Sequence, residues 1–483
     1  MDTAPSSTNA GTAPEPLGRI ARHVWQQAWP TVLTMASYTV MQFVDSLMVA
    51  QVGPRQVAAQ GNGGIWSFTP LAFLFGFLTV VNTFVSQSVG GGRRDAVARY
   101  AWAGIWLAVG AWLVVMVPWA LLMPYAFHRM GHEPALVELE SSYGRILAFG
   151  SLATLLGKAL SNVFFGIQRP RVITLAAILG NVVNLVLNYL LIYGEAGLPR
   201  LGLPGIPGTP ALGVAGAAVA TVCGVAAETL LPAFVFLSRD FDRRWGIRAA
   251  WRPARRELLD LLRIGWPASV QFGNEIFCWA IFMTVLVGHF GSLHLTAGWA
   301  VLRYMHMSFM PAVGFSVATT SLVGHAMGAG QPELARRRAH VAIAMAMLYM
   351  AVCGLLMALL RTPMIRLFAD GPATTPEEAA EIVRIGGRMM ICAAVFQAFD
   401  AMGMVCIGAL RGAGDTLFPG VATIVLSWGV IVGGGLLLVT LRPEWGSVGP
   451  WLAASAYIIL LGLTMAVRLE RGRWRSIRLI REV

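Results

Sequence analysis

Twelve stretches of about twenty predominantly apolar residues run through the chain, and they constrain its fold more than any other feature. A helix of about 20 residues spans the hydrocarbon core of a bilayer, where lipid-exposed backbone must satisfy its own hydrogen bonds. Of the 483 residues, 56% are hydrophobic and 12% are charged, a composition too apolar for a soluble protein. We therefore predict an all-α, polytopic membrane protein with 12 transmembrane helices. The predicted spans lie near residues 28–50, 63–88, 101–124, 143–166, 172–193, 211–237, 263–288, 297–322, 339–361, 384–408, 417–440 and 447–467.

Arginine placement predicts how these spans are oriented. The two terminal segments and the loops after every second span are rich in arginine, most of all the loop after the sixth span, whereas the intervening loops hold few. Loops of this kind face the cytoplasm, so we expect both termini to be cytoplasmic. The net charge of +12 is explained by this orientation, and we expect no nucleic-acid partner.

The chain also repeats itself. The tripeptide "AWP" at 28–30 recurs as "GWP" at 265–267, and "VGGGRRD" at 89–95 aligns with "MGAGQPE" at 327–333. At that second offset Gly76 aligns with Gly314. Each half carries six spans, an even number, so both halves begin on the same side of the membrane. This pattern predicts two six-helix bundles that enclose a cavity and are related by a pseudo-twofold axis along the membrane normal.

Composition divides the chain into five segments. Residues 1–24 are polar and proline-containing, which predicts a disordered cytoplasmic N-terminus. Residues 25–238 form the N-terminal bundle, 239–262 a basic cytoplasmic linker, 263–468 the C-terminal bundle and 469–483 a basic cytoplasmic tail. No Walker motif, metal-type cysteine spacing or cofactor motif is present in the sequence. Any pumping must therefore be driven by an ion gradient or by another subunit, and we expect no resident cofactor.

Among the carboxylates inside the predicted spans, three stand out: Asp45, Glu275 and Asp400. An ionised carboxylate at the bilayer centre costs roughly 2.5–3.5 kcal/mol on insertion scales, so such a residue is by default a candidate functional site. The open alternative is structural pairing with a buried cation. A carboxylate that holds a proton or Na⁺ and yields to a cationic substrate would support antiport. Each acid has polar neighbours on its own helix, which form a polar stripe and are expected to line the cavity. They are Tyr38 and Gln42 near Asp45, Gln271 and Asn274 near Glu275, and Gln397 near Asp400.

Other polar residues in the spans leave more than one interpretation open. Asn184 and Asn188 lie one turn apart in the fifth span, where they would either join helices or line the cavity. Lys158 is the only lysine in the chain. It would pair with an acid of the N-terminal half such as Asp45, extend to the membrane surface, or handle substrate or protons. We expect Glu228 to have a structural role.

Four segments resemble the multidrug and toxic compound extrusion (MATE) family, in its bacterial NorM-type branch: "FVDSLMVAQVG", "NLVLNYLLIYG", "GWPASVQFGNE" and "FQAFDAMGMVCIGALRGAGDT". The resemblance extends over residues 25–468. It implies a monomeric antiporter of the bacterial inner membrane that exports cationic amphiphilic drugs in exchange for Na⁺ or H⁺ by alternating access. It also implies that the chain is not an enzyme.

The resemblance also suggests roles for individual residues. The cation-site carboxylates of the family fall on Glu275 and Asp400, where Na⁺ would bind, and its first-helix acid falls on Asp45. The paired asparagines fall on Asn184 and Asn188, but the family commonly has a proline between them, where this chain has only Leu and Val. Lys158 has no counterpart in the family pattern.

A flippase and an enzyme fit the sequence less well than an antiporter does. A lipid-linked precursor flippase of the same superfamily would carry anionic cargo and should have a cavity dominated by cations. The spans instead supply Asp45, Glu275 and Asp400 against Lys158 and Arg303, which favours cationic cargo. An enzyme is not supported, because no nucleophile–base set or metal cluster is present in the sequence.

Overall fold

The computed structural model describes residues 15–129, 133–197, 204–205, 207–369 and 375–479. These residues form helices joined by short connections, and no β-strand occurs among them. Twelve of the helices are long and apolar enough to cross a membrane. The predicted all-α class and the predicted number of spans are therefore confirmed.

The N-terminal bundle contains the first six spans. Proline occupies the first position of three of its helices, where the fixed backbone angle suits a helix and the missing N–H costs nothing. The third span contains a wider helical turn, η1, and the fifth ends in another, η2. The elements are α1 (Leu17–Ala50), α2 (Pro54–Gly90), α3 (Arg94–Ala111), η1 (Trp112–Met116), α4 (Val117–Arg129), α5 (Pro134–Gly166), α6 (Pro170–Asn188), η2 (Tyr189–Tyr193) and α7 (Gly213–Phe236).

The C-terminal bundle contains the other six spans. Its longest helix, α13, begins with a capping box, in which the Thr375 hydroxyl accepts from the Glu378 N–H at 3.2 Å and the Glu378 carboxylate accepts from the Thr375 N–H at 3.1 Å. Gly414, in the left-handed region, ends this helix. The elements are α9 (Arg255–Ile281), η6 (Phe282–Val287), α10 (Ser292–Gly328), α11 (Pro332–Leu359), the short α12 (Arg361–Ala369), α13 (Pro376–Ala413), α14 (Leu417–Leu426), η8 (Ser427–Gly434), α15 (Gly435–Leu441) and α16 (Val448–Glu470).

Several helices extend beyond the apolar stretches that predicted them. Residues 17–24 belong to α1 and residues 255–262 belong to α9, although the sequence analysis assigned them to a disordered N-terminus and to the linker. Hydropathy marks only the part of a helix that lies in hydrocarbon, whereas the backbone hydrogen bonds continue where polar side chains can meet water. Residues 1–14 of the predicted disordered segment lie outside the described residues.

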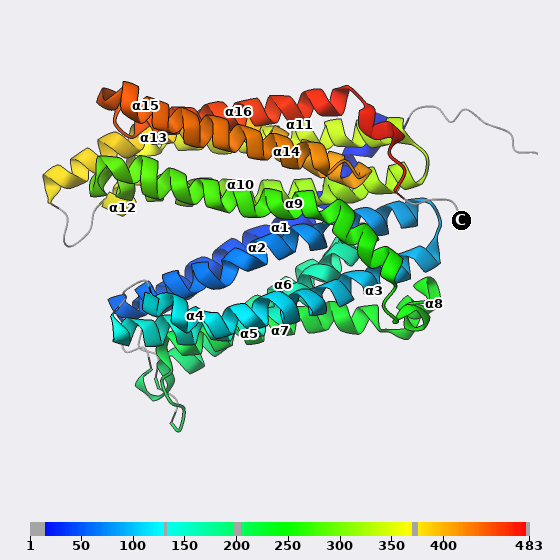
Figure 1. Ribbon diagram of the computed structural model, residues 1–483, viewed down its shortest axis with the longest axis horizontal. Helices are drawn as coiled ribbons and strands as arrows, with labels where there is room; N and C mark the ends of the chain where they lie inside the picture. The colour runs from blue at the N-terminus through cyan, green and yellow to red at the C-terminus, as the bar shows by residue number, and fades with distance from the viewer. Residues whose placement is uncertain (1–14, 130–132, 198–203, 206, 370–374, 480–483) are drawn as a thin grey trace, which may run out of the picture.

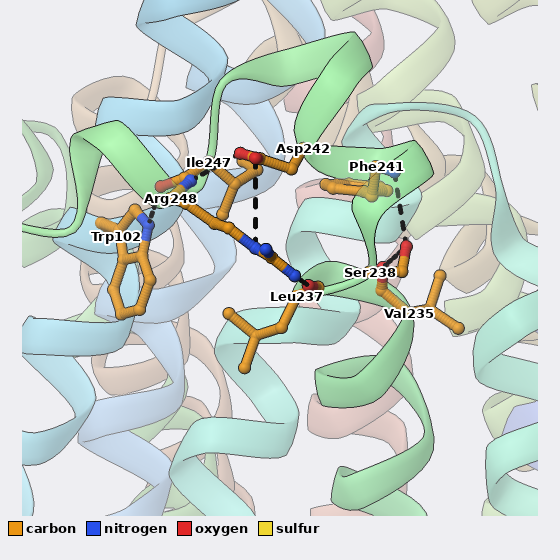
Figure 2. A network of polar contacts seen from close by, with 8 residues as sticks. All are labelled: Trp102, Val235, Leu237, Ser238, Phe241, Asp242, Ile247 and Arg248. Atoms are coloured by element: carbon orange, nitrogen blue, oxygen red, sulfur yellow. Dashed lines mark hydrogen bonds and ion pairs between the residues drawn. The ribbon is translucent and has the colours of Figure 1, made fainter.

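The linker between the bundles is packed against the N-terminal bundle. It contains the short helix α8 (Arg239–Trp245) and the turn η5 (Arg248–Ala250). Figure 2 shows how Arg248 holds it: the guanidinium donates to the Leu237 carbonyl and the backbone N–H donates to the Asp242 carboxylate, both at 2.8 Å. The indole of Trp102 in α3 donates to the carbonyl of Ile247, also at 2.8 Å.

The chain after α16 also folds back onto the protein. Trp474, in the turn η10 (Arg473–Ser476), is fully buried. Arg475 pairs with Glu333 at the start of α11 at 2.7 Å. Leu479 packs against a hydrophobic cluster that lies mainly in the N-terminal bundle. The described part of the predicted basic tail therefore connects the two bundles.

The two bundles meet at the end of the molecule where α1 begins and α16 ends, which we call the terminal face. In Figure 1 the bundles approach each other at this end, marked by α8 and the C-terminus, and diverge toward the end that carries α4 and α12. At the terminal face the hydroxyl of Thr83 donates to the Arg411 carbonyl, and the Gln87 amide donates to the Gly412 carbonyl, each at 2.9 Å. The structure is therefore closed at the terminal face.

Glycines at aligned positions of the two halves allow helices of the two bundles to approach each other closely. A Cβ on Gly76 of α2 would lie 2.2 Å from Ser269 Cα in α9, and a Cβ on Gly314 of α10 would lie 2.8 Å from Val32 Cα in α1. Such close approach of two helix backbones is possible only with glycine. The pairing of α2 with α9 therefore mirrors the pairing of α10 with α1, as the predicted pseudo-twofold axis requires.

Candidate ion and substrate site

Glu275 of α9 and Asp400 of α13 lie within electrostatic range of each other in the C-terminal bundle. Both are half-buried, and among the described residues neither forms an ion pair with a basic side chain. Tyr457 of α16 lies within range of both carboxylates. Its hydroxyl is buried and has no hydrogen-bond partner in the part of the chain that the structure describes. The structure thus brings together the two acids that the sequence analysis assigned to one cation site.

A cation lies near this pair without being bonded to it. Arg411, in the last turn of α13, is within electrostatic range of Glu275, and its guanidinium lies 5.5 Å from the centroid of the Phe272 ring. The sequence gives Arg411 no signal of an interior position, because it directly follows the predicted span 384–408 and resembles the other loop arginines. The helix continues past that stretch, so the side chain is presented to the interior. Tyr457 was missed because one tyrosine in an apolar span gives no signal by itself.

Asp45 of α1 forms a second polar cluster, in the N-terminal bundle. Its carboxylate is buried and accepts a hydrogen bond from the amide of Asn188, which also donates to Asn184 Oδ1 at 3.1 Å. Thr221 of α7 lies within interaction range of the same carboxylate. The buried atoms Asn188 Oδ1 and Asn184 Nδ2 have no partner among the described residues. Asn181, one turn earlier, bonds instead to α1, so it joins helices.

Carboxylate, amide and hydroxyl oxygens together are ligands that suit a hard cation. The Asp45 cluster presents these three kinds of oxygen from α1, α6 and α7. The wider turn η2 begins directly after Asn188, at the end of the helix that carries both asparagines. Residues 185–187, where the family commonly has a proline, belong to the regular α-helix α6.

Lys158 of α5 lies within electrostatic range of Glu228 in α7, and its ammonium is 5.3 Å from the centroid of the Phe75 ring. The Tyr38 hydroxyl of α1 donates a hydrogen bond to the Glu228 carboxylate. Asp45, named in the sequence analysis as an example of a partner, does not form an ion pair with Lys158 among the described residues. Glu228 therefore belongs to a polar group in the interior, where its hydrogen bond to Tyr38 joins α7 to α1.

Other polar residues expected to line the cavity join helices instead. In the C-terminal bundle, the Gln271 amide donates to the Thr423 hydroxyl at 3.2 Å, and the Asn274 amide donates to the Ser427 hydroxyl at 2.9 Å. The face of α9 that carries both residues packs against α14 and η8, which helical periodicity cannot reveal. Both were expected to line the cavity, and the structure shows that each also forms a hydrogen bond to a neighbouring element.

The remaining candidates are dispersed. Gln397 is 1% exposed and accepts a hydrogen bond from the Ser308 hydroxyl at 3.1 Å, so it too joins helices. Gln42 is exposed on α1. Arg303 is exposed on α10, with its guanidinium 5.9 Å from the centroid of the Phe368 ring in α12. It therefore lies toward the end of the molecule opposite the terminal face.

The fold and these interior charges define a polytopic membrane protein built from two repeated six-helix bundles with acidic groups inside each bundle. The chain belongs to the MatE family, whose sequence profile matches residues 30–190 and matches again over residues 273–433. The two matches fall one in each bundle, so the internal repeat inferred from short identities is confirmed.

Sequence relatives align with almost the whole chain. Multidrug resistance protein NorM of Burkholderia vietnamiensis is 30% identical over 472 residues, covering 95% of this chain and 96% of the relative. Probable multidrug resistance protein NorM of Mesorhizobium japonicum is 29% identical, covering 97% of each chain.

Solved structures show the same fold. An outward-facing multidrug resistance MATE family transporter of the MOP superfamily superposes with a TM-score of 0.83, covering 96% of this chain and 99% of that one. A MOP superfamily transporter from Pyrococcus furiosus, described as having a binding pocket of reversed polarity, superposes with a TM-score of 0.83, covering 96% of this chain and 99% of that one. Each is only 20% identical to this chain in sequence, so these superpositions establish a shared fold and nothing more.

Proposed function

We propose that this protein is a secondary active multidrug efflux antiporter that exports organic cations in exchange for Na⁺ or H⁺. The observation that carries this proposal is the proximity of Glu275 and Asp400, neither of which is ion-paired to a described base. The names of the sequence relatives, which are multidrug resistance proteins, support the same substrate class. We expect no catalytic step and no resident cofactor.

The two acids supply a physical basis for exchange. Two carboxylates that share a region of low dielectric repel each other strongly, so binding of one cation between or upon them is favourable. A proton, Na⁺ or an organic cation can each provide that charge, and they compete for the same place. Antiport follows if the site changes its accessible side only when one of the competing cations occupies it.

Closure at the terminal face suggests which half of the cycle the structure represents. The arginine-rich loops lie at this face, so we place it in the cytoplasm, in the inner membrane of a bacterium. A protein closed there and spread at the opposite end would release cargo outward. The return step would be a rocking of the two bundles about the contacts of α1, α2, α9 and α10.

The Asp45 cluster is proposed as a further coupling-ion site. The unpartnered Asn188 Oδ1 would gain from a bound cation, and the unpartnered Asn184 Nδ2, a donor, would gain from a rearranged hydrogen-bond network. Na⁺ suits the oxygen ligands offered there. A proton on Asp45 would be the alternative, because it too would remove the charge of the buried carboxylate.

A second candidate function is the flippase of an anionic lipid-linked precursor. The observation that favours it is the presence of two interior cations, Lys158 and Arg411, within electrostatic range of each other. We prefer cationic cargo because each of these bases faces an interior acid of its own, Glu228 or Glu275.

The two functions are separated by comparing cargo in a bacterial host that lacks its own exporters. Expression of the chain should lower the steady-state accumulation of a fluorescent organic cation by several-fold, and Asp400→Asn should abolish this effect. In vesicles, a fluorescent polyprenyl-phosphate lipid should move across the membrane no faster with the protein than without it. Accelerated lipid movement together with unchanged dye accumulation would support the flippase instead.

A further inference from the structure

A cavity of about 910 Å³ opens at the terminal face between α3 and α9, beside the last described residues of the chain. Six arginines line it, against three acids. We call it the arginine pocket. The arginines come from the start of α3, the first turns of α9 and the tail, namely Arg93, Arg99, Arg255, Arg256, Arg263 and Arg478, and the acids are Asp95, Glu257 and Asp260.

The acids of the pocket are already engaged. Arg99 pairs with Glu257 at 2.8 Å and with Asp95 at 3.2 Å. The carboxylate of Asp260 accepts a hydrogen bond from the Tyr100 hydroxyl at 2.9 Å. Arg99 therefore forms ion pairs with two of the three acids, and the third, Asp260, is hydrogen-bonded to the neutral Tyr100 hydroxyl.

Four of the arginines around the pocket have no acidic partner among the described residues. Arg255, Arg256, Arg263 and Arg478 are all exposed, and none of them forms an ion pair with a described residue. Four guanidinium groups gathered around one cavity attract an anion. The planar fork of arginine favours phosphate oxygens in particular, because it can donate two parallel hydrogen bonds to them.

The surroundings of the pocket place it at the depth of lipid headgroups. Trp251, just before α9, and Trp266, in the fourth turn of α9, are 51% and 49% exposed. Exposed tryptophan is typical of the membrane interface. The apolar side chains of Leu259 and Leu479 line the same cavity. A ligand that fits must therefore offer a phosphate and an apolar portion side by side.

We propose that the arginine pocket binds a phosphate-bearing anion, and that in the membrane this is the headgroup of an anionic phospholipid. Basic pockets between helices on the cytoplasmic side are suited to such headgroups. The walls of the pocket belong to both bundles and to the tail, which are brought together by closure of the terminal face. The bound lipid therefore stabilises the closed state, and a ligand that favours one state shifts the population toward it. Placement in the cytoplasmic leaflet rests on the orientation proposed above.

The test uses the full-length protein in nanodiscs of phosphatidylcholine with increasing phosphatidylglycerol, read out by the melting temperature and by intact-complex mass spectrometry. The pocket variant is Arg255→Gln/Arg256→Gln/Arg263→Gln. A matched control, Arg243→Gln/Arg244→Gln/Arg252→Gln, removes the same charge from exposed linker positions outside the pocket. Each basic group near a membrane surface contributes about a fivefold factor, so the pocket variant should bind roughly a hundredfold more weakly.

The proposal requires that phosphatidylglycerol raises the melting temperature of the wild type and of the control, with one or two lipids retained in the mass spectrum, and that the pocket variant loses both effects. An equal response of wild type and pocket variant would overturn it, as would equal losses in the pocket and control variants. If millimolar inorganic phosphate stabilises the wild type as well as the lipid does, the occupant is free phosphate and the lipid assignment fails. Should the triple variant not fold, Arg263→Gln alone must show a weaker response than Arg252→Gln. None of these readouts depends on transport, so they are independent of the proposed antiport.

Discussion

Gly90 and Gly328 close the terminal face from the two sides of the pseudo-twofold axis. A Cβ on Gly90 of α2 would lie 2.0 Å from the His325 carbonyl oxygen of α10, and a Cβ on Gly328 of α10 would lie 2.0 Å from the Gln87 carbonyl oxygen of α2. Each glycine thus meets the symmetry equivalent of the residue that its counterpart meets. The two helix backbones touch here, and any side chain at either position must push them apart.

We therefore predict that Gly90→Val or Gly328→Val opens the terminal face. Spin labels on the exposed positions Arg94 and Arg337, in a background without the native cysteines, should report longer distances than in the parent, and drug export should fall by at least about tenfold. Gly110→Val is the control, because no heavy atom lies within 4 Å of the added Cβ. Unchanged distances in both glycine variants would show that these contacts do not hold the bundles together.

Another pair of aligned glycines shows what could be predicted from the sequence. The alignment of Gly76 with Gly314, made from short identities, anticipated two equivalent helix contacts, because a repeated sequence buries repeated surfaces. Glu275 and Asp400 were also expected to form one cation site, and the structure places them within electrostatic range of each other. In these cases depth in the membrane and resemblance to the family pattern were sufficient.

Neighbours across helices were harder to infer. Helical periodicity gives the face on which a residue lies, but not the helix that covers that face. Gln271 and Asn274 were therefore taken for cavity residues, although α14 and η8 cover them. The proximity of Lys158 to Glu228 was missed for the same reason, since α5 and α7 are not consecutive spans.

Neutralising either acid of the C-terminal site should abolish ion-coupled export. Glu275→Gln and Asp400→Asn keep side-chain size but remove the charge for which the cations compete, so export should fall by about a hundredfold while membrane insertion is retained. The measurement is efflux of a fluorescent organic cation from energised cells at equal protein levels. Glu444→Gln, which removes an exposed carboxylate 3.4 Å from Arg442, should export normally. Wild-type drug resistance in cells that carry Asp400→Asn would count heavily against the mechanism.

Asp45 should determine the response to Na⁺ in the N-terminal bundle. If its oxygen cluster binds Na⁺, the melting temperature of purified wild-type protein should rise with NaCl relative to choline chloride, because a ligand stabilises the state that binds it. Asp45→Asn should eliminate that difference, and Asn188→Ala should weaken it. A sodium response that survives in Asp45→Asn would exclude this cluster as the sodium site.

Lys158 and Glu228 should be coupled energetically. Removing only one partner leaves the other charge in the interior uncompensated, so Lys158→Met should lower the free energy of unfolding by about 2 kcal/mol. The double variant Lys158→Met/Glu228→Gln should regain at least half of that loss, which thermal denaturation in detergent can measure. Lys158→Arg keeps the charge and serves as the control. If the loss in the double variant equals the sum of the losses in Lys158→Met and Glu228→Gln, the two groups do not interact.

The proposed antiport depends on the exchange of a coupling ion for an organic cation at Glu275 and Asp400. The direct measurement is transport of a fluorescent organic cation in proteoliposomes of purified wild-type protein, with a Na⁺ gradient and a pH gradient imposed separately. We predict that dye movement follows one of these gradients, identifying the coupling ion, and that it is lost in Glu275→Gln and Asp400→Asn. Dye movement that ignores both gradients in the wild type, or that follows them equally well in the two variants, would contradict the account.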